Sequence, residues 1–171
     1  MIVRLSQKLN TKLKAGILGT CPLDSNPYAD WSCHLFTADR TQYIILSNTA
    51  SLYSCVMFGR GVTDDSIFIA RACDAIREAL IADGQQFVYE RFIAPSSAEV
   101  QYAKTLNCGV TGSMNDLINL AKYSLENNDI APYSLAADLN EVLLSYLGTP
   151  ETHGYDRPTN VFRRLPTQFS L

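Results

Sequence analysis

Two neighbouring runs in the first third of the chain constrain the fold most. The runs "WSCHLFT" (31–37) and "QYIILSN" (42–48) are rich in aromatic and β-branched residues, and only a short turn separates them. Such runs predict the two strands of a hairpin. Successive side chains of a strand point to opposite faces, so Trp31 leads one face and His34 lies on the other. The alternation requires a packed side, and we expect Trp31 to be largely buried. We interpret His34 as a partly exposed residue of the sheet rather than a catalyst.

The clearest helix is predicted for residues 64–84. Thr63 can cap its start, two aspartates favour its first turn, and Gly84 is a natural stop. The apolar stripe at helical spacing consists of Ile69, Cys73, Ile76 and Leu80. Further helices are predicted for residues 7–14, 95–104, 113–125 and 134–147, the last with Ser134 as its cap, and further strands for residues 2–6 and 86–93. The segment 49–62 is ambiguous, because Leu52, Cys55 and Val56 have helical spacing before a Gly-Arg-Gly stretch.

These elements predict one α+β domain over residues 1–171. A small, mainly antiparallel sheet from segments 2–6, 31–37, 42–48 and 86–93 would be covered by helices near 64–83, 113–126 and 134–147. Residues 149–171 form a C-terminal tail that keeps several apolar residues, and we expect it to pack on the domain.

The composition limits the chemistry. The 171 residues are 47% hydrophobic and carry a net charge of −3, so the chain has no global attraction to nucleic acid or acidic membranes. Five scattered cysteines without a C-x-x-C pair predict free thiols and a cytoplasmic location. No stretch approaches the roughly 20 apolar residues that span a bilayer. With two histidines 119 residues apart, we expect no metal site and no cofactor.

The run "TLNCGVTGSMNDL" (105–117) is the most distinctive candidate site. Ser113 and Asp116 match a capping box, and Gly112 allows a tight turn before it, so Ser113 is predicted to cap a helix. Alternatively, the first N–H groups of that helix could hold an anion together with Lys104. Asp116 would repel a phosphate, which favours the cap. The candidate ligand-binding residues are Lys104, Thr105, Asn107, Gly112, Ser113, Asn115 and Asp116.

Nucleophilic catalysis has weaker support. Cys108 and Ser113 could each act as a nucleophile, but each needs a base nearby. No histidine is close in sequence, and only folding could bring His34 or His153 to either residue. The catalytic residues are therefore unassigned, and enzymatic activity is left open.

Five pieces of the chain carry a resemblance. They are "LSQKL" (5–9), "DWSCHL" (30–35), "YIILSN" (43–48), "AKTLNCGVTGSMNDL" (103–117) and "DLN" (138–140). With them, the chain resembles an uncharacterised family of small, mostly bacterial proteins of unknown function, which share a late K-T-x-x-x-x-V-x-G-S-M-N-D-L run. The resemblance implies a compact α+β domain with no established activity. In the family, the position of Cys108-Gly109 more often holds Arg-Ser, and losing that arginine weakens an anion site.

Three functions remain open. The leading hypothesis is an intracellular accessory or regulatory domain that binds a protein partner. The first alternative is an enzyme or sensor that holds a small anionic ligand at Lys104, Ser113 and Asn115. The second is a nucleic-acid-acting protein of a mobile-element or toxin–antitoxin module. It would use the basic residues Arg4, Lys8, Lys12 and Lys14, and the acidic net charge counts against it.

Overall fold

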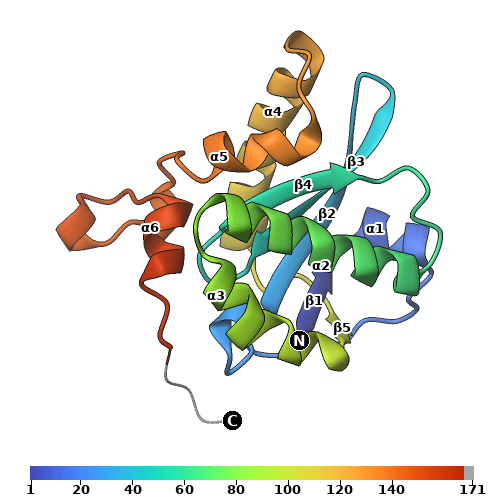
Figure 1. Cartoon of the computed structure of the whole chain (residues 1–171), viewed down its shortest axis with the longest axis horizontal. Helices are drawn as coiled ribbons and strands as arrows, with labels where there is room; N and C mark the ends of the chain where they lie inside the picture. Colours follow the sequence, from blue (N-terminus) through green and yellow to red (C-terminus); the bar gives the residue numbers. More distant parts are fainter. Residues whose placement is uncertain (168–171) are drawn as a thin grey trace.

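Five strands form one mixed sheet in the order β4–β3–β2–β1–β5 (Figure 1). The computed structural model describes residues 1–167. The strands are β1 Ile2–Leu5, β2 Asp30–Ala38, β3 Thr41–Asn48, β4 Ser54–Phe58 and β5 Gln101–Ala103. β2, β3 and β4 are antiparallel neighbours, whereas β1 pairs in parallel with β2 and β5. The predicted α+β domain is confirmed, but its sheet is mixed rather than mainly antiparallel.

The predicted hairpin is confirmed as β2 and β3. Ala38 faces Thr41 across the turn, and the two residues between them, Asp39 and Arg40, have φ angles of 41° and 61°. Positive φ at both central residues gives the turn a twist that matches paired strands. Trp31 is 1% exposed, as predicted, and its indole Nε1–H donates to the Tyr28 carbonyl over 2.8 Å.

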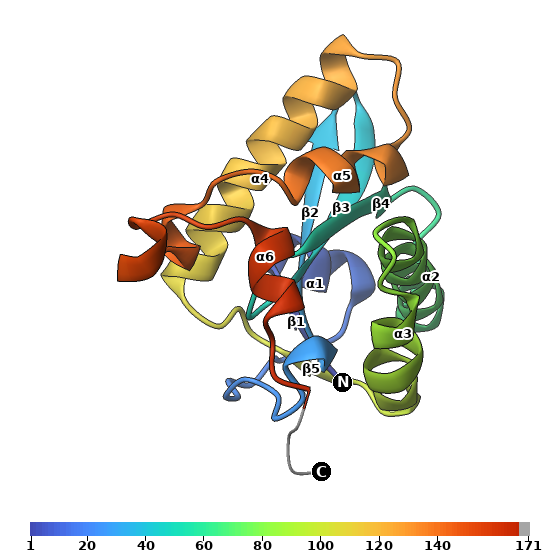
Figure 2. The same ribbon diagram turned by 60° about the vertical axis from the view of Figure 1, so that its left-hand side comes forward.

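Helices cover both faces of the sheet (Figure 2). On one face lie α1 Gln7–Leu13, α2 Asp65–Ala82 and α3 Gln86–Val88, which continues as a π-helical turn over Tyr89–Ile93. On the other face lie α4 Cys108–Asn127 and α5 Leu135–Leu139. Near the C-terminus, α6 spans Pro158–Arg163. Short 3-10 turns cover Pro27–Ala29, Pro95–Ala98, Pro132–Ser134 (η4), Ser145–Leu147 and Pro150–Thr152.

The sheet separates two apolar cores. Alternate residues of the strands pack against α1, α2 and the 86–93 segment on one face, and the others pack against α4 and α5. The first core includes Val3, Trp31, Leu46, Phe68 and Ile76. The second includes Phe36, Ile45, Val56, Met114 and Leu117. The strands therefore hold one layer of helices on each side of the sheet.

The predicted strand over residues 86–93 is wrong, because the segment is helical. Its buried residues are Val88, Phe92 and Ile93, whereas Phe87 is 63% exposed. Spacings of four and five residues between inward side chains fit a helical turn and not the period of a strand. The aromatic residues favour a strand, but packing of this segment against the first core stabilises the helical turn instead.

The ambiguous segment 49–62 contains a strand, β4, rather than a helix. Four consecutive residues, Ser54–Met57, are buried, because α2 covers one face of β4 and α5 covers the other. Burial on both faces removes the alternation that reveals a strand in the sequence. β5 lies within the predicted helix 95–104, of which only the 3-10 turn Pro95–Ala98 is helical.

The predicted helix over residues 134–147 ends at Leu139. Ser134 makes no side-chain cap bond, and Leu143 and Tyr146, which lie beyond the end of the helix, are 58% and 43% exposed. At the helix end, the Asn140 carbonyl accepts from the Thr159 N–H instead of from a further helical turn.

The residues after 149 lie partly on the first core. Phe162 is 1% exposed and contacts the rings of Tyr28 and Tyr53, whereas Tyr155 is 54% exposed. The last four residues of the predicted tail, 168–171, lie outside the described residues. All five cysteines are free thiols, as predicted. No helix among the described residues is long and apolar enough to cross a membrane.

Candidate functional site

The run 105–117 contains a helix start, but at a different residue from the one predicted. α4 begins at Cys108, and its cap is Asn107, whose Oδ1 accepts from the Val110 N–H over 2.9 Å. Ser113 lies in the second turn and is 8% exposed, so the prediction that Ser113 is the cap is wrong. Gly109 lies in the first turn of α4 against Tyr146, and a Cβ at this position would lie 2.3 Å from the ring.

The predicted ligand-binding residues of this run do not converge. Lys104, Thr105 and Asn107 precede or cap α4, whereas Gly112, Asn115 and Asp116 are exposed along the helix. Ser113 points into the second core, about 200° around the helix from Asn115. An anion held by Lys104, Ser113 and Asn115 would need three side chains that point in different directions, so the anion hypothesis loses its geometric basis.

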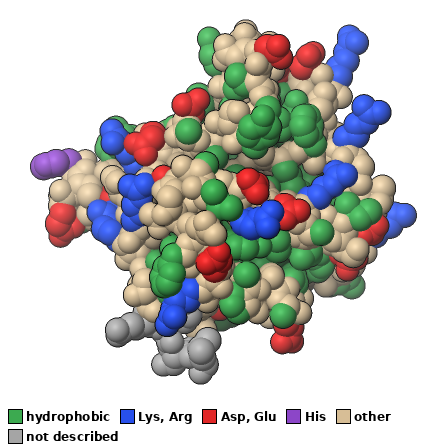
Figure 3. All heavy atoms as spheres, viewed as in Figure 1, with side chains coloured by type: hydrophobic (Ala, Val, Ile, Leu, Met, Phe, Trp, Pro, Cys, Tyr) green, Lys and Arg blue, Asp and Glu red, His purple; other side chains and the backbone are tan. Residues whose placement is uncertain are grey.

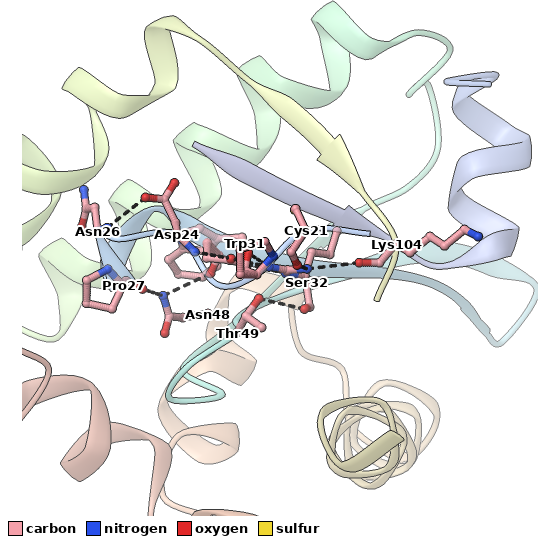
Figure 4. Close-up of polar contacts among 12 residues, drawn as sticks. Cys21, Asp24, Asn26, Pro27, Trp31, Ser32, Asn48, Thr49 and Lys104 are labelled. Atoms are coloured by element: carbon pink, nitrogen blue, oxygen red, sulfur yellow. Dashed lines mark hydrogen bonds and ion pairs between the residues drawn. The ribbon is translucent and has the colours of Figure 1, made fainter. Parts of the chain in front are cut away.

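Arg4 is buried in a polar network rather than displayed on a basic surface. Figure 4 shows two of the residues of this network, Cys21 and Lys104. Its guanidinium forms a two-pronged ion pair with Asp30, with both N···O distances 2.8 Å. The remaining N–H groups donate to the carbonyls of Cys21, Pro22 and Lys104. All five donors of the side chain are therefore used.

This network joins three parts of the chain to the sheet. It connects β1, the loop before β2 and the segment that leads from β5 to α4. Burial alone would lower the pKa of Arg4, but the hydrogen bonds and charge of Asp30 raise it overall. With no donor left for a ligand, Arg4 has a structural role, and the basic patch predicted for nucleic acid loses its first member.

His34 is buried rather than partly exposed. It lies on the same face of β2 as Phe36, and it is 6% exposed. Burial lowers its pKa from 6.5 to about 4, so the ring is neutral at pH 7. Its Nε2 has no hydrogen-bond partner, and within residues 1–167 no bond links the ring to Cys108 or Ser113. The structure therefore gives no nucleophile–base pair there.

One hollow of the described surface follows the outer edge of β4. Its volume is about 820 Å³, and we call it the β4 groove. β4 forms the floor, α2 one wall, and η4 with α5 the other. Figure 3 shows hydrophobic side chains interspersed with acidic and basic ones on the face that carries α2 and β4. The walls are built largely from small side chains, namely Ala75, Ala79, Ala82, Ala136 and Ala137.

The outer edge of β4 lies at the floor of the β4 groove and is largely covered, because η4 contacts both β4 and α2 and Val56 is 1% exposed. β4 is the last strand of the sheet, and Gly59 donates its N–H to Gln42 of β3. N–H and C=O groups alternate between the two sides of a strand, so Val56 and Phe58 direct theirs away from β3 and into the groove. No residue among 1–167 supplies a hydrogen-bond partner for these groups.

The Asn140 side chain binds the same edge of β4 at Ser54, two residues before Val56. Its Oδ1 accepts from the Ser54 N–H over 2.6 Å, and its Nδ2 donates to the Ser54 carbonyl over 2.9 Å. The side chain therefore makes the two bonds that a neighbouring strand would make. The carbonyl of Asn140 accepts in turn from the N–H and hydroxyl of Thr159, which ties the C-terminal segment to this corner.

The charged side chains that line the groove are acidic. They are Asp74, Glu78, Asp83 and Glu141. Asp83 pairs with Arg163 and Glu141 with Arg157, whereas Asp74 and Glu78 share the cation of Arg77 at 3.6 and 3.3 Å. Arg60 and Arg71 line an adjoining hollow beside Asp74 and Phe58, so arginines accompany all of these carboxylates.

Comparison with known families identifies the chain at the level of its family. The family model for a domain of unknown function, DUF6933, matches residues 2–161. The chain belongs to the DUF6933 family. The match covers both walls and the floor of the β4 groove, so the groove lies within the DUF6933 domain. No curated protein and no solved structure matches the chain.

The sequence did not predict the β4 groove of this DUF6933 domain. No single segment forms the groove, because β4, α2 and α5 meet only in the folded chain. Two signals were readable: alanines at positions 75, 79 and 82, with the spacing of one helix face, and Asn140 in the "DLN" run. Among the described residues, no group of three or more His, Cys, Asp or Glu side chains could hold a metal ion.

Proposed function

We propose that this DUF6933 chain is a binding domain that takes a segment of a protein partner into the β4 groove. The observation that carries the proposal is the apolar hollow of about 820 Å³, whose walls are built from alanines and at whose floor Phe58 is 49% exposed. A polypeptide offers apolar side chains that fit such walls. This function agrees with the leading hypothesis from the sequence.

Other classes of ligand fit the β4 groove less well. A small apolar molecule would cover the N–H and C=O groups of the floor without bonding them, which costs free energy. A phosphate or a nucleic acid would meet Asp74, Glu78 and Asp83, whose carboxylates already occupy the cations of Arg77 and Arg163. A protein segment therefore satisfies more of the groove than either alternative.

Selection of short random peptides displayed against the full chain tests the proposal. We expect an enriched sequence family that binds in the micromolar range or tighter. In NMR titrations, its largest amide shift changes should fall on β4, α2 and α5. The variant Ala75→Trp places a large ring on the α2 wall and should abolish binding, because Ala75 lines the groove.

The matched control is Ala70→Trp, which changes an exposed alanine of the same helix outside the groove and should leave binding intact. Failure to enrich any family, or shift changes centred elsewhere, would overturn the proposed function. Equal binding by the two tryptophan variants would do the same.

We also propose that the domain works in a bacterial cytoplasm. The five free cysteines support a reducing compartment, where such thiols persist. We further propose that the run 104–117 recurs among relatives, with its asparagine or a substitute cap before α4. Thiol labelling in cells that found oxidised cysteines would refute the proposed cytoplasmic location. An alignment of the family that lacked the run 104–117 would refute its proposed recurrence.

A further inference from the structure

We infer that the segment bound in the β4 groove carries an aspartate or glutamate side chain at the Phe58 end, where its carboxylate pairs with Arg60 and Arg71. The inference rests on the proposed function and adds to it the charge and the position of one residue of the partner. It depends on three features: the place of the two arginines, their lack of an ion pair, and the exposed ring of Phe58 beside them.

Arg60 and Arg71 line a second hollow that continues the β4 groove. This hollow has a volume of about 490 Å³, and Met57, Phe58 and Asp74 border both it and the groove. We call it the arginine end of the groove. A bound segment that extends past Phe58 therefore enters the arginine end and meets both guanidinium groups.

The loop after β4 holds the Arg71 guanidinium in place. Its Nη1 donates to the Arg60 carbonyl over 2.7 Å. Gly61 has a φ of 76°, a left-handed conformation that favours glycine, and a Cβ there would lie 3.3 Å from Arg71 Nη2. The Gly-Arg-Gly run (59–61) therefore lets the backbone approach the guanidinium closely, and Arg71 is oriented before a ligand binds.

Neither arginine has a carboxylate partner within residues 1–167. Asp74 borders the same hollow but pairs with Arg77, at 3.6 Å. Apart from the bond to the Arg60 carbonyl, the side-chain N–H groups of Arg60 and Arg71 have no acceptor in this part of the chain. A guanidinium presents a planar fork of N–H donors that matches a carboxylate, so both side chains are available to an acidic ligand.

The charge balance favours one added carboxylate. The groove and its arginine end, with their ion-pair partners, hold one arginine more than they hold carboxylates. The carboxylates are Asp74, Glu78, Asp83 and Glu141, and the arginines are Arg60, Arg71, Arg77, Arg157 and Arg163. One carboxylate side chain completes this balance, whereas a phosphate group brings about two negative charges next to Asp74.

Phe58 supplies an apolar surface beside the two arginines. Its ring stacks on that of Tyr43, with 5.4 Å between the centroids, and Tyr43 stacks on Phe36. Phe58 is nevertheless 49% exposed. An apolar side chain next to the acidic residue of the partner would cover this ring and exclude water from the arginines. Exclusion of water strengthens the attraction between the carboxylate and the guanidinium groups.

Peptides selected on the full chain test the inference. We expect the enriched family to carry Asp or Glu at one fixed position, and its replacement by Asn or Gln should weaken binding about tenfold. The double variant Arg60→Gln/Arg71→Gln should weaken the acidic peptide to a similar degree, and should bind the amide peptide as well as the unaltered chain does. Arg40→Gln is the matched control, because Arg40 is exposed and lines neither hollow.

A reversal of charge gives a second test that does not disturb the bond made by Arg71. Arg60→Glu should weaken the acidic peptide more than Arg60→Gln does, because it adds repulsion to the lost attraction. A lysine in place of the acidic residue of the peptide should restore binding to Arg60→Glu. Thermal melts of each variant show whether the domain is folded.

Several results would overturn this inference and leave the proposed function standing. Peptides could map to the groove and carry no acidic residue, or bind equally well when that residue is an amide. Peptides that lose binding only when their C-terminus is amidated would assign the arginines to a terminal carboxylate instead. A concentration-dependent dimer that Arg60→Gln/Arg71→Gln abolishes would favour a second copy of this chain. Failure to enrich any family would instead overturn the proposed function, and this inference with it.

Discussion

Removing the Arg4 side chain should destabilise the domain strongly. Arg4 and Asp30 are 1% and 0% exposed, and the substitution Arg4→Met keeps an unbranched apolar side chain but leaves the Asp30 carboxylate buried without its cation. Breaking a buried ion pair from one side costs about 3–5 kcal/mol. For a chain of this length, that loss corresponds to a fall in melting temperature of about 6–20 °C.

Urea denaturation and thermal melts followed by far-UV circular dichroism measure the loss. Arg77→Met is the matched control, because Arg77 also pairs with two carboxylates but is 47% exposed, and such pairs contribute about 0–1 kcal/mol. Because the Arg4 guanidinium also holds the carbonyls of Cys21, Pro22 and Lys104, amide hydrogen exchange should accelerate in residues 19–24 and 104–107.

A double-mutant cycle with Asp30→Asn separates the pair from its surroundings. We expect the double variant to lose less stability than the sum of the two single losses, with a coupling of about 1–3 kcal/mol. If Arg4→Met costs no more than Arg77→Met, or if the two losses simply add, the ion pair does not hold these segments and the reasoning is refuted.

Two further predictions concern α4 and β2. Asn107→Ala should lower the free energy of unfolding by about 0.5–2 kcal/mol, because it removes the cap of α4. Ser113→Ala should change it by less than about 0.5 kcal/mol. If chemical denaturation showed the reverse order, Ser113 would be the cap. His34 has a pKa of about 4 when folded and 6.5 when unfolded, so the unfolded state binds the extra proton between these values. The contribution of neutral His34 to the free energy of unfolding should therefore be at its maximum above pH 6.5. It should be lost as the pH falls toward 4, which lowers the free energy of unfolding by up to about 3 kcal/mol. His34→Leu should flatten that window in urea titrations, and an unchanged slope would contradict the burial of His34.

Local pattern was sufficient for the elements whose partners are close in sequence. The hairpin of β2 and β3 was predictable because its two strands adjoin one tight turn, and α2 was predictable because its stripe repeats over 18 residues. β4 and β5 were not, since β4 is buried on both faces and β5 has only three residues. Their identity depends on neighbours that the local sequence does not contain.

The candidate site depended even more on contacts between distant residues. Asn140 lies at the end of α5, and its side-chain amide binds Ser54, 86 residues away; nothing in the "DLN" run reveals that partner. A helix start was predicted within the run 105–117, but the predicted cap, Ser113, was wrong. The cap is Asn107, six residues earlier, and Ser113 lies buried in the second turn of α4. A site built from three elements could only be recognised once they were folded together.

The strand order also affects how the protein forms during synthesis. β1 is made first and pairs with β2 within the first 38 residues, but its other neighbour, β5, ends at Ala103. At a synthesis rate of about 5–20 residues per second, one edge of β1 waits roughly 3–13 s for β5. During that interval, the nascent chain exposes a second open edge that the finished domain conceals. Slower translation of residues 39–103 should therefore increase the time available for aggregation.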